Sequence, residues 1–175
     1  MTPDQQQIAL KRALEYPYSL THQSFVFQAG RQVTHQLVYG LQEFPNVSER
    51  IPVLAVGSNQ SPEQLARKFP STDWGKIPTS RVHLHDFDSV FSAHVTGYGS
   101  IAATLHPAPG TCVSLYVNWL DQRQLIAMHE TELPNKNYTY SQLKNIQISV
   151  DAGPHLTAVN LYIGRRGAYA PEGNS

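Results

Sequence analysis

The chain has 175 residues, the length of one domain with a sizeable hydrophobic core. Hydrophobic residues make up 41% and charged residues only 15%, so the composition predicts a folded chain and excludes a disordered one. The 13 basic and 13 acidic side chains give a net charge of +0, which argues against a nucleic-acid partner because such a partner requires a basic excess.

The first part of the chain predicts a helix followed by a hairpin. A helix is expected over residues 4–15, with an apolar stripe that includes Leu10 and Leu14. Two strands are expected over residues 24–27 and 33–38, because apolar residues flank a glycine turn there.

The pattern then predicts a buried strand that leads through a glycine turn into a helix. The strand covers residues 51–56, Gly57-Ser58-Asn59 forms the turn, and a helix over residues 61–69 begins with Ser61 as its cap. The first amides of a helix lack partners and carry partial positive charge, so this turn is a candidate site for an anion. The competing interpretation is a plain strand-to-helix connection.

The rest of the chain alternates between short strands and one further helix. The expected elements are an irregular segment over residues 69–79, one or two strands over 81–94, a strand over 101–105, a turn over 107–110, a strand over 112–119, a helix over 121–132, and strands over 138–150 and 158–163. Asp121 as cap and Gln124 three residues later form a capping box for the helix.

The helix over residues 121–132 carries the candidate catalytic residue. At 3.6 residues per turn, Leu125, Met128 or His129, and Glu132 fall on one stripe, whereas Glu130 points elsewhere. Because the apolar stripe meets the core, Glu132 is expected to enter the interior or a cleft, where a carboxylate can act as a general acid or base. The competing interpretation is a solvated residue at a helix end.

Other reactive side chains give weaker patterns. His83 and His85 face the same side of a predicted strand, but no third ligand stands at a recognisable spacing, so we expect no metal site. Cys112 opens a predicted strand and is expected to be a small core residue.

The sequence also bears on location. No apolar run approaches the roughly 20 residues that span a bilayer, and the N-terminal residues lack the pattern of a signal peptide. The single cysteine cannot form an internal disulfide. We therefore expect a cytoplasmic protein without a membrane partner, and the sequence does not indicate its oligomeric state.

Several of these segments, taken in order, resemble the gamma-glutamylcyclotransferase-like superfamily. The matching segments are Val56-Gly57-Ser58-Asn59, Ile101 to Leu105, Pro107-Ala108-Pro109-Gly110, Val113 to Trp119, Leu125 to Glu132, and Tyr138. The resemblance covers about residues 51–150. It implies an α+β fold, a small mixed-strand β-barrel with short flanking helices, here with an extra N-terminal helix and hairpin. On this basis residues 1–50 are an N-terminal extension packed on a main domain of residues 51–175.

The resemblance also implies an activity and roles for individual residues. In the enzymes of this family the turn amides hold a γ-glutamyl group, the α-amine of the substrate attacks its own γ-carbonyl, and 5-oxoproline leaves. By position, Val56, Gly57, Ser58, Asn59 and Tyr138 would bind the substrate. Glu132 would be the general acid/base, and no metal or cofactor is expected.

Two other interpretations stay open at this point. The chain departs from the family pattern at Val56, where a tyrosine is usual, and at Leu133, where a glycine is usual. These departures favour a non-catalytic binding or regulatory module that holds a small carboxylate ligand in the same cavity. A third interpretation is an α+β domain whose first fifty residues mediate assembly.

Overall fold

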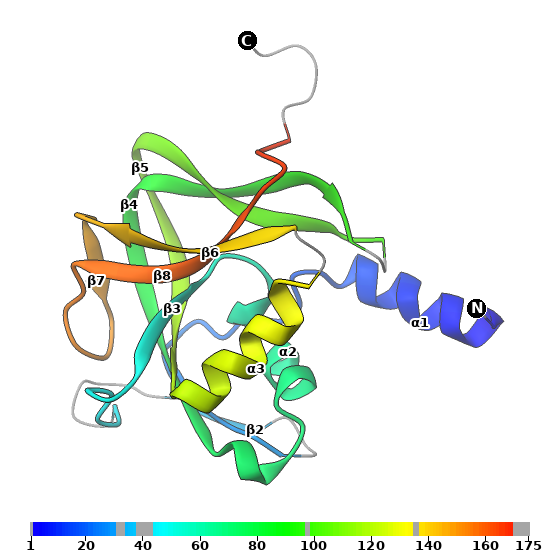
Figure 1. Cartoon of the computed structure of the whole chain (residues 1–175), viewed down its shortest axis with the longest axis horizontal. Coiled ribbons are helices and arrows are strands. Elements are labelled where there is room, and N and C mark those ends of the chain that lie inside the picture. Colours follow the sequence, from blue (N-terminus) through cyan, green and yellow to red (C-terminus); the bar gives the residue numbers. More distant parts are fainter. Residues whose placement is uncertain (1, 31–33, 38–43, 97–98, 135–136, 170–175) are drawn as a thin grey trace.

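The computed structural model describes residues 2–30, 34–37, 44–96, 99–134 and 137–169, and it shows a mixed α+β protein (Figure 1). Its helices are α1 (Pro3–Leu14), α2 (Pro62–Lys68) and α3 (Gln122–Glu132), with single 3₁₀ turns η2 (Ser58–Gln60) and η3 (Thr72–Trp74). The strands are β1 (Phe25–Gln28), β2 (Thr34–Leu37), β3 (Ile51–Ala55), β4 (Lys76–Val95), β5 (Ile101–Leu120), β6 (Tyr138–Lys144), β7 (Ile148–Val150) and β8 (Ala158–Gly164). The predicted α+β class is therefore confirmed.

The strands form one sheet in which β3 lies between two partners. The order along the sheet is β2-β1-β4-β5-β3-β8-β6, and β7 pairs separately with β4. Leu54 of β3 pairs with Val117 of antiparallel β5 and with Leu161 of parallel β8. All three side chains are buried in one hydrophobic cluster, so the end of β3 is held rigidly where the glycine turn begins.

The predicted barrel is not confirmed. In the described part of the chain, the path of paired strands ends at β2 on one side and at β6 on the other. Ser92 near the end of β4 forms a single bridge with Ala168, which follows β8. One bridge brings these two segments together, but it does not make a continuous strand pairing.

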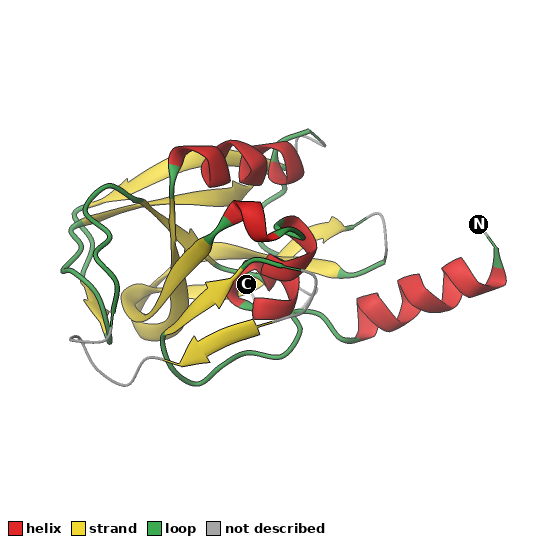
Figure 2. Ribbon diagram, turned by 90° about the horizontal axis from the view of Figure 1, so that it is seen from below, coloured by secondary structure: helices red, strands yellow, loops and turns green. Residues whose placement is uncertain are grey.

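The N-terminal elements differ sharply in how they meet the rest of the molecule. β1 pairs with β4, and Phe25 and Phe27 are fully buried in the core. α1, in contrast, projects from the body (Figures 1 and 2) and has no buried residue. The expected apolar stripe does not reach the core, since Leu10 is 59% and Leu14 77% exposed.

α3 follows its predicted pattern closely. The Asp121 side chain accepts from the Gln124 amide at 2.8 Å, and the Gln124 side chain accepts from the Asp121 amide at 3.0 Å, which is the predicted capping box. Leu125 and Met128 are buried, as the helical stripe requires, and Glu130 is exposed.

β5 is one continuous strand where two strands and a turn were predicted. The register passes from His85–Cys112 to Phe87–Pro107, so residues 108–111 bulge out opposite the single residue Asp86. The Gly110 amide donates to the Asp86 carboxylate at 2.8 Å, and Gly110 has a φ of 81°. The Pro-Gly segment therefore acts as a bulge that leaves the strand pairing intact on both sides.

Three further predictions were wrong. β4 already begins at Lys76, inside the segment expected to be irregular, because its first residues pair with β1. The strand expected over residues 138–150 is divided into β6 and β7 near Asn145, which has a φ of 56°. Cys112 is exposed and not a core residue, because it faces away from the core beside the bulge of β5.

Replacing the buried Gln124 is expected to destabilise the fold. Its amide group donates to the backbone oxygens of Trp74 and Lys76 and accepts from Arg50, so Gln124→Ala leaves several polar groups unpaired. We expect the free energy of unfolding in urea to fall by about 2–3 kcal/mol. The exposed neighbour Gln122→Ala is the control and should change it by less than about 0.5 kcal/mol. Equal effects of the two substitutions would contradict this role.

Candidate functional site

A cavity of about 630 Å³ opens beside the turn that follows β3. All the candidate site residues line it: Val56, Gly57, Ser58, Asn59, Glu132 and Tyr138. The structure thus brings together two segments more than seventy residues apart in sequence, the glycine turn and the end of α3. The roles of these residues in binding and catalysis stay predictions.

The turn and α3 meet through a direct hydrogen bond. Asn59 Nδ2 donates to Glu132 Oε1 at 2.9 Å. Asn59 is fixed from behind, because the side chain of fully buried Asn118 donates to the Asn59 backbone oxygen at 3.0 Å. Asn118 itself accepts from Thr79 at 3.1 Å, so strands β4 and β5 position the turn.

Lys68, at the end of α2, forms an ion pair with Glu132. The side chain of Lys68 is only 6% exposed and that of Glu132 only 16%, so both charges are largely withdrawn from water. A charge in such a place needs a partner of opposite sign or several hydrogen bonds. This pairing could not be predicted from the sequence, because a lysine is common in the last turn of a helix, where it interacts favourably with the helix dipole.

One polar atom at this meeting point lacks a partner. Asn59 Oδ1 is buried and accepts no hydrogen bond from any described residue. Its orientation is determined, because the amide nitrogen must face the Glu132 carboxylate, which only accepts. The site therefore offers a buried acceptor next to a carboxylate, a combination suited to an N–H donor on a ligand.

Tyr162 of β8 adds a neutral hydroxyl to the cavity wall. Its oxygen lies 2.7 Å from His129 Nδ1, and Tyr140 packs against both rings. Burial raises the pKa of Tyr162 well above its usual value, and the negative charge of Glu132, together with that of Tyr140 once it ionises, raises it further. Burial also raises the pKa of Tyr140. Tyr162 therefore keeps its proton at physiological pH.

The segment after α1 supplies a wall of the cavity that the sequence did not predict. The Tyr16 hydroxyl accepts from the Ala103 amide at 2.9 Å, and Tyr138 donates to the Ala103 oxygen at 3.4 Å. A Cβ atom at position 57 would collide with the Tyr16 hydroxyl, so this close approach requires glycine at the turn.

The other candidate residues lie outside this cavity. His83 Nδ1 is 2.9 Å from Ser114 Oγ, and His83 Nε2 is 3.2 Å from Asp151. His85 Nε2 is 3.9 Å from the Cys112 sulfur. Across the described ranges, no three His, Cys, Asp or Glu side chains gather as potential metal ligands. Nor is any described helix long and apolar enough to cross a membrane.

The raised pKa of Tyr162 predicts a loss of stability in alkali. The folded protein keeps this proton at a pH where the unfolded chain, with a tyrosine pKa of about 10, loses it. The free energy of unfolding should therefore decrease as the pH rises above about 10. Tyr162→Phe should make this decrease smaller, whereas Tyr169→Phe, at a 57% exposed position, should not. Denaturant unfolding between pH 9 and pH 11 measures how the free energy of unfolding of each variant changes with pH. The same decrease in Tyr162→Phe as in the wild type would contradict the prediction.

Comparison with known proteins gives similarities of structure only. No family model and no curated protein matches the sequence. The fold is similar to a structure named gamma-glutamyl cyclotransferase, with 18% identity and a TM-score of 0.48 over 67% of this chain and 68% of that one. An uncharacterized Homo sapiens protein has 20% identity and a TM-score of 0.49, over 67% of this chain and 68% of that one. An Arabidopsis thaliana protein has 16% identity and a TM-score of 0.48, over 71% of this chain and 74% of that one.

Proposed function

We propose that the cavity binds a small γ-glutamyl compound and cyclises it, with Glu132 as general acid/base. The observation that carries the proposal is the pairing of Glu132 with Asn59, whose buried Oδ1 has no donor among the described residues. A ligand amine fits both groups, because it can donate one hydrogen bond to Asn59 Oδ1 and another to the carboxylate. The order of motifs along the chain supports the same reaction.

The proposed reaction moves one proton through Glu132. The carboxylate takes a proton from the ligand's α-ammonium, and the freed amine attacks the γ-carbonyl carbon of the same molecule. The bond from that carbon to the leaving nitrogen then breaks, and Glu132 returns the proton to this nitrogen. The attacking nitrogen carries two protons once its bond to the γ-carbon has formed, and it releases one of them to the departing amine, which leaves as an ammonium group. The products are 5-oxoproline and an amine. Because the attack is intramolecular, holding the ligand in a bent conformation supplies much of the rate, and the proposal requires no metal or cofactor.

The turn amides are the proposed donors to the ligand's oxygens. The first internal bonds of η2 run from Gln60 to Gly57 and from Ser61 to Ser58, so the amides of Ser58 and Asn59 precede them. Fixed donors of this kind stabilise the negative oxygen that forms when the amine attacks. Val56 and Tyr138 complete the proposed binding wall.

The Lys68–Glu132 ion pair supports a second candidate, a binding or regulatory module without turnover. Glu132 Oε1 already receives donors from both Asn59 and Lys68. A carboxylate held in this way can fix a small ligand without moving a proton. The same cavity would then bind a small carboxylate compound and release it unchanged.

Loss of the Glu132 carboxylate tests catalysis directly. Purified protein is supplied with γ-glutamyl amino acids, glutathione and γ-glutamylamines, and the release of 5-oxoproline is measured. Glu132→Gln should lower the rate by about a hundred-fold or more, the usual effect of removing a general acid or base. Glu130→Gln is the matched control, because it makes the same change at an exposed position two residues away.

The outcomes separate the two candidates. If the wild type and Glu130→Gln release 5-oxoproline and Glu132→Gln does not, the result supports the proposed enzyme. Ligand binding by calorimetry without turnover in any variant supports the module. Turnover that survives in Glu132→Gln would contradict the role proposed for this residue. We also propose a cytoplasmic location, on the sequence features given above, and a transferase or lyase classification, on the proposed reaction.

A further inference from the structure

We propose that Arg12 and Arg67 form a subsite for a carboxylate group of the ligand at the mouth of the cavity. Arg12 belongs to α1 and Arg67 to α2, and both line the cavity. The subsite lies partly in the N-terminal segment, outside the region that resembles a known family. The inference rests on the proposed function for the rest of the ligand, a γ-glutamyl group.

The two guanidinium groups meet on a single side chain, Tyr18. Arg12 Nε donates to the Tyr18 hydroxyl at 3.1 Å, and the Arg67 guanidinium carbon lies 4.3 Å from the centre of the Tyr18 ring. Tyr18 is only 6% exposed. A buried ring contacted by two cations restricts both of them, so their donors point in fixed directions.

Local backbone preference does not explain the position of Tyr18. Its φ is 74°, a conformation that a tyrosine rarely adopts, and its amide donates to the Glu15 oxygen at the end of α1. In this unfavourable conformation, the Tyr18 side chain lies in contact with both Arg12 and Arg67. The contact is therefore a built feature of the cavity rim and not a chance approach of surface side chains.

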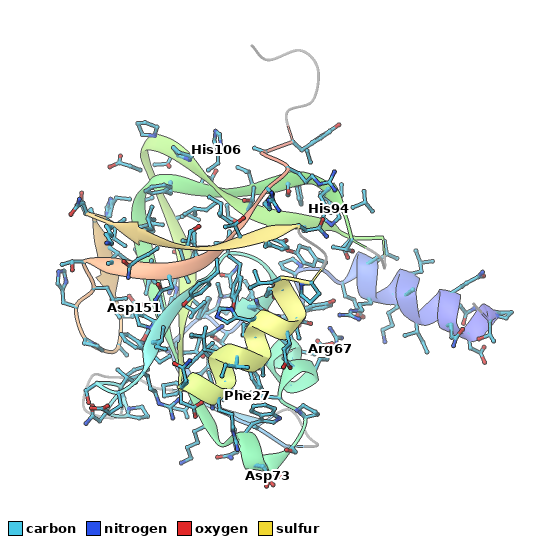
Figure 3. The ribbon with its side chains drawn as sticks, viewed as in Figure 1. Phe27, Arg67, Asp73, His94, His106 and Asp151 are labelled. Atoms are coloured by element: carbon cyan, nitrogen blue, oxygen red, sulfur yellow. The ribbon has the colours of Figure 1, made fainter. Side chains whose placement is uncertain are left out.

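The charges of the cavity lining favour an anionic ligand group. Among the described residues that line the cavity, Arg12, Arg67 and Lys68 are cations, and Glu132 is the only carboxylate. Glu132 forms an ion pair with Lys68. Arg67 pairs with Glu63 at the surface, where both side chains are at least one-third exposed. Since consecutive residues of α2 point in different directions, Lys68 faces inward and Arg67 faces the rim. Figure 3 shows Arg67 on the side of the molecule from which α1 projects.

The subsite makes the preferred ligand a γ-glutamyl compound whose leaving part ends in a carboxylate. Planar guanidinium groups match carboxylates in geometry as well as in charge. A γ-glutamylamine with a neutral tail would meet the same cavity without this contact. The structure thus assigns the choice between the two ligand classes to Arg12 and Arg67.

The test compares two ligands that differ only in this group. Binding of γ-glutamylglycine and of γ-glutamylethylamide is measured by calorimetry on the full chain. The wild type should bind γ-glutamylglycine about ten-fold or more tightly than the amide, and Arg12→Gln should remove this preference by weakening γ-glutamylglycine alone. Arg67→Gln should have the same effect, whereas Arg12→Lys should keep part of the preference for γ-glutamylglycine.

Lys11→Gln is the matched control, because it removes the same charge from the neighbouring, 75% exposed side chain. It should leave both affinities unchanged. Three results would each overturn the subsite. These are equal binding of the two ligands by the wild type, an equal loss of affinity for both ligands in Arg12→Gln, and an effect of Lys11→Gln that equals the effect of Arg12→Gln. Binding without release of 5-oxoproline would refute the proposed catalysis and still support the subsite, so the two failures can be told apart.

Discussion

The carboxylate of Glu132 holds together the segments that form the candidate site. Through Asn59 and Lys68 it connects the turn after β3 with the ends of α2 and α3. These groups are largely withdrawn from water, so each depends on the others for a partner, and removing one leaves a polar or charged atom unsatisfied. These polar contacts therefore help to fix the three segments relative to one another.

The surrounding sheet makes this meeting possible. β3 is fixed between β5 and β8 by buried apolar side chains, and Asn118 of β5 holds the backbone of the turn. The N-terminal segment then adds Tyr16, whose hydroxyl lies against Gly57 and the amide of Ala103. The cavity is thus a composite of elements from both ends of the sequence, placed around one rigid strand.

The sequence predicted the parts of this site that depend on local patterns. The caps and helical period of α3 located Glu132, and the strand–glycine–helix pattern located Gly57 to Asn59. Lys68 and Tyr162 were not predicted, because their significance comes from contacts between segments distant in sequence. Arg12 and Tyr16 were missed for the same reason. The Pro-Gly segment of β5 predicts a turn although it forms a bulge, because a bulge and a turn use the same residue types and only pairing across the sheet distinguishes them.

α1 contributes a side chain to the cavity although the helix itself has almost no support from the core. A 12-residue helix without buried side chains relies on its own capping box at Thr2 and Gln5, and isolated helices of this length are only marginally stable in water. Its last turn nevertheless carries Arg12 to the cavity wall. Any molecule that contacts Arg12 would also stabilise helical order upstream of it, so occupancy of the cavity and the coil-to-helix equilibrium of the N-terminus are thermodynamically linked.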